Sequence, residues 1–174
     1  HVDAALTEYW MLRPEAGMEH AEKGLVIARS LGMEDHQYMW LLLCKARHAL
    51  YLVDTSTCLR ETYEAMDIAR GQGSIWGQSV GHDILAKVAL ARNDLDQALK
   101  YTTKAVTLSK NSGIVVWQAE LALQLAEIHM ATGNLQQASQ LLDSTAQQWT
   151  VSRLMACRRS LLLGLIHCHE GRMQ

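Results

Sequence analysis

Apolar residues recur through most of this chain at spacings of three and four positions, which is the period of a helix with one buried face. The segment before residue 54 is apolar around much of its circumference, which indicates a helix packed on two sides. Clusters of small polar residues and glycine separate the segments. The pattern predicts about nine helices, over residues 1–12, 14–31, 35–53, 57–71, 76–92, 94–111, 115–132, 134–149 and 152–170.

Several of these helices have a recognisable first turn. Pro14 suits that position because the N–H that it lacks would have no helical partner there. The side-chain oxygens of Asp35 and of residues 54–57 can accept hydrogen bonds from exposed helix amides. Asp94 and Asn134 are each followed three positions later by glutamine, a variant of the capping box. Helices are therefore predicted to begin close to these residues.

The turn before the sixth predicted helix recurs forty positions later. Residues 91–98, Ala-Arg-Asn-Asp-Leu-Asp-Gln-Ala, correspond to residues 131–138, Ala-Thr-Gly-Asn-Leu-Gln-Gln-Ala. Gly32, Gly73 and Gly113 repeat with nearly the same period. A period of this length is typical of stacked helix hairpins, none of which can bury both faces alone. The predicted repeats are about 1–32, 35–73, 75–113, 115–150 and, incomplete, 152–174.

Small residues occupy fixed places within these repeats. They stand late in the first helix of a hairpin and twice, seven positions apart, in the second, where helices would cross closely. The matching residues are Leu85, Ala86, Ala98 and Ala105; Leu125, Ala126, Ala138 and Thr145; and, more loosely, Ala46, Cys58 and Ala65. This arrangement resembles the tetratricopeptide repeat over nearly the whole chain. The resemblance implies an all-α fold, a right-handed α-solenoid of antiparallel helix pairs forming a single domain over 1–174.

Three features depart from the usual tetratricopeptide pattern. The period near forty exceeds the usual thirty-four residues. Gly17 and Gly24 stand at the small positions of the first repeat. The usual aromatic residue of the first helix is replaced at four places, namely Ala49, Ala89, His129 and His167.

The long repeats are similar to the sensor regions of MalT-like, LuxR-type transcriptional regulators of bacteria. That resemblance implies a non-enzymatic sensor that binds a small-molecule inducer, a peptide or a regulatory protein and signals to neighbouring modules of the same chain. A generic protein–protein interaction scaffold is the alternative. Related peptide-pheromone receptors use similar repeats, so a peptide-binding receptor domain is a further alternative.

In the tetratricopeptide geometry the first helices line a concave groove. The residues expected there are Trp40, Arg47, Tyr51, Asp83, Lys87, Glu120, Glu127 and Arg158. Both signs of charge together with two aromatic rings suit a peptide or a small polar ligand. The alternative is a solvated face whose charges form ion pairs within the molecule.

Other clusters give weaker indications of chemistry. Residues 167–170, His-Cys-His-Glu, are consecutive, so on a helix their side chains diverge and cannot converge on one metal ion. His82 or His129 would indicate catalysis only beside a carboxylate and a nucleophile, and the sequence has no Gly-x-Ser-x-Gly turn or phosphate-binding glycine loop. We therefore expect no enzyme, no metal and no cofactor. The tryptophans expected to fill volume between helices are Trp10, Trp76, Trp117 and Trp149.

Composition narrows the class of protein further. The formal net charge of -2 over 174 residues does not favour direct nucleic-acid contact. The apolar run at 39–44 is far shorter than a membrane span, and the four cysteines, without paired short spacings, indicate reduced thiols of a cytoplasmic protein. The chain begins with His1 rather than methionine, so we expect a fragment of a longer protein. Its terminal helices would expose apolar faces, which predicts self-association.

Overall fold

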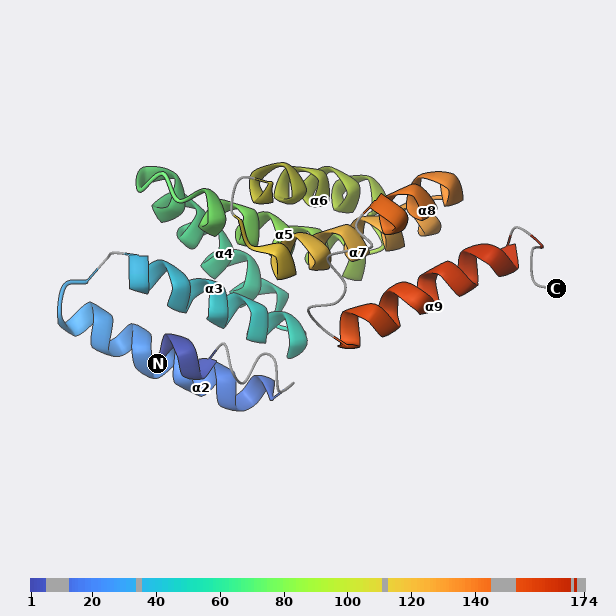
Figure 1. Ribbon diagram of the computed structural model, residues 1–174. Coiled ribbons are helices and arrows are strands. Elements are labelled where there is room, and N and C mark those ends of the chain that lie inside the picture. Colours follow the sequence, from blue (N-terminus) through green and yellow to red (C-terminus); the bar gives the residue numbers. More distant parts are fainter. Residues whose placement is uncertain (6–12, 34–35, 111–112, 145–152, 170, 172–174) are drawn as a thin grey trace. The chain divides into compact units, whose positions relative to one another are not determined.

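The computed structural model describes residues 1–5, 13–33, 36–110, 113–144, 153–169 and 171. Within those ranges the secondary structure is helical, as Figure 1 shows, and it contains no strand. The labelled helices are α2 (Pro14–Ser30), α3 (His36–Tyr51), α4 (Thr55–Gly71), α5 (Ile75–Ala91), α6 (Leu95–Ser109), α7 (Val115–Ala131), α8 (Leu135–Ser144) and α9 (Arg153–His169). The prediction of an all-α fold made of helix pairs is confirmed for the described part of the chain.

Three of the predicted helix starts have the expected chemistry. Asp54 Oδ1 accepts a hydrogen bond from the Thr57 amide at 3.0 Å at the start of α4, and Asp94 Oδ1 accepts one from the Gln97 amide at 3.1 Å at the start of α6. Each bond satisfies an amide that has no partner inside its helix. Pro14 lies in the first turn of α2.

The Asn134 side chain makes a different contact from the one expected. Its amide group donates to Thr132 Oγ1 at 3.0 Å, which ties Asn134 to the preceding turn. A hydrogen bond between Asn134 and Gln137 stays a prediction. Asp35, the predicted cap of α3, lies outside the described residues.

Each of the helices α3, α5, α7 and α9 is followed, two residues beyond its end, by a residue with positive φ. These residues are Val53, Asn93, Gly133 and Gly171, with φ of 61°, 57°, 79° and 68°. The first three lie forty positions apart, so the backbone repeats with the period found in the sequence. Glycine and asparagine adopt this left-handed conformation readily, whereas it is strained for a β-branched residue such as Val53.

The chain forms two compact units, His1–Val88 and Ala89–Gln174, and each is described by itself. In the first unit α2 packs against α3, and α3 packs against α4. In the second unit α7 packs against α6, α8 and α9. The largest fully buried side chains include Met39, Leu42, Leu43 and Ile84 in the first unit, and Leu121, Leu123, Ile128, Leu142 and Ile166 in the second.

The two glycines of the first repeat stand where neighbouring side chains approach α2 most closely. A Cβ atom added at Gly17 would lie 2.0 Å from the His48 ring, and one added at Gly24 would lie 2.5 Å from Leu41 Cδ2. Both neighbours belong to α3, so any side chain at these positions would push α3 away from α2. Glycine at these small positions therefore still marks a helix crossing.

The predicted small positions of the later repeats are fully buried as well. Those with zero exposure are Ala46, Cys58, Ala65, Ala86, Ala98, Ala105, Ala126 and Ala138. Ala98 packs with Ile128, and Ala126 packs in the core that joins α7, α8 and α9. Thr145 lies outside the described residues.

Enlarging these crossings should destabilise the protein. Ala98→Leu and Ala126→Leu should each lower the free energy of unfolding by about 1–3 kcal/mol, because the added atoms overpack a closed helix contact. Gln136→Ala, at an exposed position of α8, should change it by less than about 0.5 kcal/mol. Urea unfolding followed by circular dichroism measures the difference, and equal stabilities for all three variants would contradict the repeat register.

The strained turn at Val53 predicts a stabilising substitution. Val53 is 83% exposed, so Val53→Gly removes little packing and should raise the free energy of unfolding by about 1 kcal/mol as the left-handed strain is relieved. Asn93→Val, at the equivalent turn, should lower it by a similar amount. Thermal unfolding of the two variants tests this, and a shift in the same direction for both would show that the turn conformation is not the cause.

Candidate functional site

Three charged residues predicted to line the groove lie together in the first unit. The carboxylate of Asp83 on α5 is fully buried. Its Oδ2 lies 2.9 Å from Lys87 Nζ, one helical turn further along α5, and 3.6 Å from Arg47 Nη2 on α3. Arg47 is also buried, whereas the Lys87 side chain is 24% exposed. We call Arg47, Asp83 and Lys87 the charge cluster.

The charge cluster fixes the relation between α3 and α5. A carboxylate removed from water is costly unless it is neutralised, and here two cations share one carboxylate. Asp83 Oδ1 accepts no hydrogen bond from any residue that the structure describes, so the compensation comes through Oδ2, which accepts a hydrogen bond from Lys87 Nζ and lies near Arg47. Lys87 is the member of the cluster that reaches solvent, and it is the one able to meet a ligand directly.

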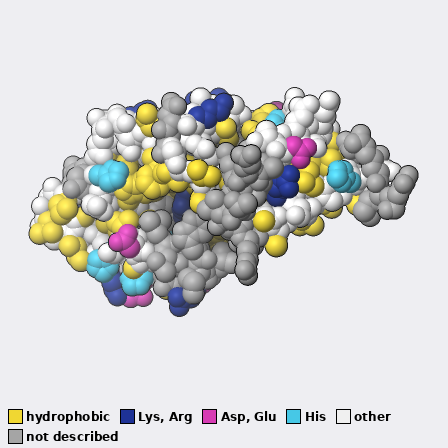
Figure 2. Space-filling view, in the orientation of Figure 1, with side chains coloured by type: hydrophobic (Ala, Val, Ile, Leu, Met, Phe, Trp, Pro, Cys, Tyr) yellow, Lys and Arg dark blue, Asp and Glu magenta, His cyan; other side chains and the backbone are white. Residues whose placement is uncertain are grey.

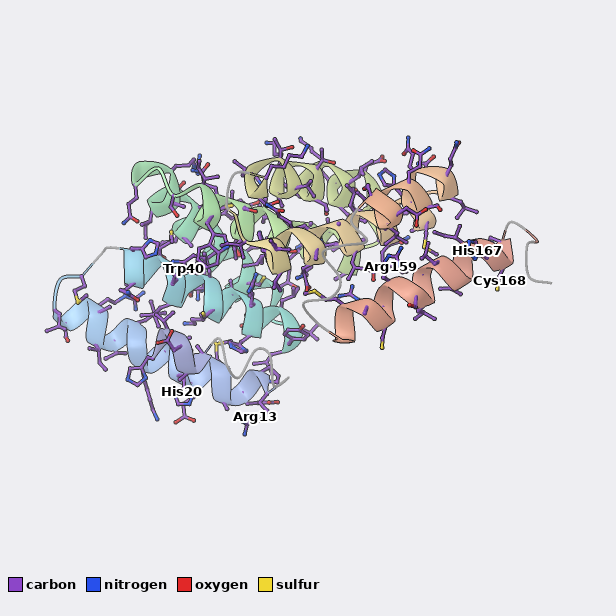
Figure 3. The ribbon with its side chains drawn as sticks, viewed as in Figure 1. Arg13, His20, Trp40, Arg159, His167 and Cys168 are labelled. Carbon is purple, nitrogen blue, oxygen red and sulfur yellow. The ribbon has the colours of Figure 1, made fainter. Side chains whose placement is uncertain are left out.

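Two tryptophans lie against each other at the beginnings of α3 and α5. The ring centroids of Trp40 and Trp76 are 4.5 Å apart, tilted by 56°. Trp40 Nε1 donates a hydrogen bond to His36 Nε2 at 2.7 Å. Figure 2 shows hydrophobic side chains gathered in the region where Figure 3 labels Trp40.

The burial of the two tryptophan rings is the reverse of what the sequence predicts. Trp40, expected to face the groove, is 7% exposed, whereas Trp76, expected to fill volume between helices, is 40% exposed. Helical periodicity predicts on which side of a helix a side chain lies, but it does not predict which residues of other helices cover that side chain. Trp76 covers Trp40, so Trp76 is the tryptophan that a ligand would contact. Trp117 is buried as expected, while Trp10 and Trp149 lie outside the described residues.

Tyr51, the last residue of α3, is about half exposed. It lies one helical turn beyond Arg47 on the same helix, so the two side chains share a face of α3. The first unit thus offers exposed aromatic surface at Trp76 and Tyr51 and a charged group at Lys87. Binding of a ligand by these residues stays a prediction.

The remaining predicted groove residues form ion pairs in the second unit. Arg158 on α9 lies 2.7 Å from Glu127 Oε1 and 3.9 Å from Glu120 Oε1, both on α7. The Arg158 and Glu127 side chains are more than a third exposed, so solvent screens this pairing. Intramolecular ion pairs, one of the two alternatives drawn from the sequence, are therefore present here.

A hollow that the sequence did not indicate lies between α6, α7 and α8. Its volume is about 650 Å³, and it is lined by Leu99, Thr103, Leu125, His129, Gln137, Gln140, Leu141 and Ser144. Burial lowers the pKa of the His129 imidazole, which favours the neutral ring. None of the lining residues is acidic, so the hollow does not bring His129 against a carboxylate as acid–base catalysis would require.

Two of the four cysteines, Cys44 and Cys58, lie in the core of the described residues. Burial raises the pKa of the Cys44 and Cys58 thiols to about 11, so both stay protonated and unreactive. Over the described ranges no three His, Cys, Asp or Glu side chains are grouped closely enough to hold a metal ion, and Glu170 falls outside those ranges. None of the described helices is both long and apolar enough to cross a membrane.

Residues 85–148 match the family model of the tetratricopeptide repeat. The match runs from the second half of α5 to just beyond α8. Together with the buried small residues at the helix crossings, it supports a tetratricopeptide-like fold of stacked helix pairs. No curated protein and no solved structure matches the chain significantly.

Removing the buried carboxylate should be far more costly than removing an exposed one. Asp83→Ala leaves Arg47 buried without its compensating charge, so the free energy of unfolding should fall by about 3–5 kcal/mol. Glu127→Ala breaks a partly exposed pair with Arg158 and should cost about 1 kcal/mol or less. Urea unfolding measures both changes. Similar losses for the two variants would mean that the charge cluster does not hold α3 against α5.

Proposed function

We propose that this chain is a non-enzymatic repeat scaffold that binds a protein partner. The observation that carries the proposal is the tetratricopeptide-like stack of helix pairs, matched by the family model over residues 85–148. Repeats of this kind build extended surfaces from side chains of successive helices. Such a surface suits a polypeptide segment, which can contact several helices at once.

The face of the first unit that carries Trp76, Tyr51 and Lys87 is the proposed binding surface. Exposed aromatic rings supply large contact area with few rotatable bonds, which is why they dominate binding energy in protein interfaces. Lys87, held by the buried Asp83, adds a positioned positive charge. A segment that carries an apolar side chain and an acidic side chain complements these groups.

A sensor module of a MalT-like, LuxR-type regulator is a narrower hypothesis. It rests on the style of the repeats in the sequence, and no comparison links the chain to such a regulator. A peptide-binding receptor domain would use the same kind of surface as the scaffold. The scaffold is the function that the repeat match supports without further assumption, and a cytoplasmic location remains part of the proposal.

Substitutions on the proposed surface should weaken partner binding without unfolding the protein. Trp76→Ala and Lys87→Gln should each lower the affinity for the captured partner roughly tenfold or more, because each removes a contact of the type that dominates interface energy. Glutamine can still donate a hydrogen bond toward Asp83, and Arg47 keeps its charge beside that carboxylate. Lys100→Gln, an equal charge change at an exposed position of α6, is the matched control and should bind normally. Partners captured on immobilised protein are identified by mass spectrometry, and their affinities for purified variants are then measured by calorimetry.

A screen of small compounds separates a scaffold from a sensor. A saturable change of tryptophan fluorescence and melting temperature with one compound from a panel of small metabolites, lost in Trp76→Phe, would favour the sensor hypothesis over the scaffold. Equal partner binding by Lys100→Gln, Trp76→Ala and Lys87→Gln would instead place the binding surface elsewhere on the protein.

A further inference from the structure

The hollow between α6, α7 and α8 is a feature of the second unit that the proposed function does not use. Because α6 and α8 both pack against α7, they form its two sides and α7 forms its floor. Leu125 and His129, one helical turn apart, are the α7 residues in the floor. The buried residues that join α7 and α8 to α9 are a different set, and none of them lines the hollow. The next helix of the chain, α9, therefore packs against other faces of α7 and α8.

The first unit has a corresponding place between α2, α3 and α4. Gly32 and Gly113, both with positive φ, follow α2 and α6, while Val53 and Gly133 follow α3 and α7 in the same way. Counting back or forward from these residues relates the two places. By this count, the second-unit residues Thr103, Leu125 and Leu141 correspond to the first-unit residues Glu22, Lys45 and Glu61.

In the first unit Lys45 bridges the two sides of that place. Its Nζ lies 3.3 Å from Glu22 Oε1 on α2 and 3.5 Å from Glu61 Oε1 on α4. The Lys45 side chain is 17% exposed and Glu61 is buried, so the charged side chains fill the space between the helices. Thr103 and the two leucines that replace them in the second unit carry no charge and form no such bridge. The second unit is thus open where the first unit is closed.

The open hollow combines apolar surface with neutral hydrogen-bonding groups. Its apolar surface comes from a leucine of each helix, namely Leu99, Leu125 and Leu141. Its sides carry the Thr103 hydroxyl and the Gln137 and Gln140 amides, whose side chains make no hydrogen bond with any residue that the structure describes. Hydroxyl and amide groups can each both donate and accept a hydrogen bond. The hollow therefore offers unused donors and acceptors beside leucine side chains.

His129 adds a neutral polar group at the floor. Burial lowers the pKa of its imidazole, so the ring is uncharged at neutral pH. Its Nδ1 atom is buried and has no hydrogen-bond partner among the described residues, whereas buried polar atoms in proteins are usually paired. None of the described residues that line the hollow carries a charge, so a charged ligand would find no opposite charge there. The lining favours an uncharged ligand.

The length of the hollow favours a small molecule over a polypeptide segment. On α8 the lining residues extend from Gln137 to Ser144, which is about 10 Å at the rise of an α-helix. About three residues of an extended chain cover that length, so a longer segment would pass over residues outside the hollow. The volume of about 650 Å³ lies within the range of sites that bind small ligands.

We propose that the hollow between α6, α7 and α8 binds a small uncharged molecule with an apolar body and neutral hydrogen-bonding groups. The apolar body lies against the three leucines, and the polar groups bind Thr103 and the two glutamines. The proposal goes beyond the scaffold function, because the hollow shares no residue with the surface that carries Trp76, Tyr51 and Lys87. The two proposals can therefore fail separately.

The first experiment titrates the full chain with phenylnaphthylamine, an uncharged aromatic amine whose fluorescence rises when it leaves water. The fluorescence should saturate with one molecule bound per chain, and Trp76→Ala should bind the probe as the unaltered chain does. The probe's sulfonated analogue, anilinonaphthalene sulfonate, has the same rings and a negative charge. It should bind at least about tenfold more weakly, because the lining offers its charge no partner.

The second experiment closes the hollow as the first unit closes its own. Thr103→Glu, Leu125→Lys and Leu141→Glu combined should weaken phenylnaphthylamine binding by at least about tenfold, since the lysine can bridge the two glutamates as Lys45 does. Gln97→Glu adds the same net charge at an exposed position of α6 outside the hollow and should bind the probe normally. Circular dichroism and urea unfolding check that each variant is folded.

A milder variant covers the case in which the triple variant does not fold. Thr103 and Gln140 are exposed, so Thr103→Ala combined with Gln140→Ala should leave the fold unchanged. It should weaken phenylnaphthylamine binding about threefold or more, because it removes a hydroxyl and an amide that can bind the amine. Unchanged affinity in this folded variant would contradict the proposed polar contacts.

Three further results would overturn the proposal. Fluorescence that never saturates, or equal affinity for the sulfonated analogue, would show that the hollow does not select an uncharged molecule. Equal probe binding by the folded triple variant and the unaltered chain would place the probe elsewhere. A captured protein partner that the triple variant no longer binds, while Gln97→Glu still binds it, would show that the hollow takes a polypeptide.

Discussion

Close approach of helices at residues with little or no side chain is the constraint on which the rest of this structure depends. A single helix pair has two faces to bury and can bury one by itself, so each pair needs the next. The approach is close enough that Gly17 admits the His48 ring and Gly81 admits Met66. Where helices approach this closely, there is no room for a larger side chain at the crossing. The positions of the helices are then set by these contacts, and they determine which other side chains become buried.

The charge cluster is one of those consequences. Gly77 and Gly81 let α5 approach Met39 on α3 and Met66 on α4, and that approach takes the Asp83 side chain out of solvent. A buried carboxylate requires a positive neighbour, and Arg47 and Lys87 supply it from α3 and α5. The polar residues of the candidate site are thus held by the same contacts that close the core. Trp76 and Tyr51 remain at its edge as the exposed aromatic groups.

The sequence predicted well the features that depend on neighbouring residues in the chain, such as helix starts. It predicted less well how deeply a side chain is buried in the folded protein. Asp54 and Asp94 predicted helix starts because a carboxylate just before a helix can accept a hydrogen bond from a free amide of its first turn. The alanines spaced seven apart predicted helix crossings because two helices approach closely where a side chain is small. Val53 gave no sign of a left-handed turn, since valine disfavours that conformation and the turn is imposed by the helices on either side. The burial of Trp40 and the hollow beside His129 depend on residues from more than one helix, which helical periodicity does not record.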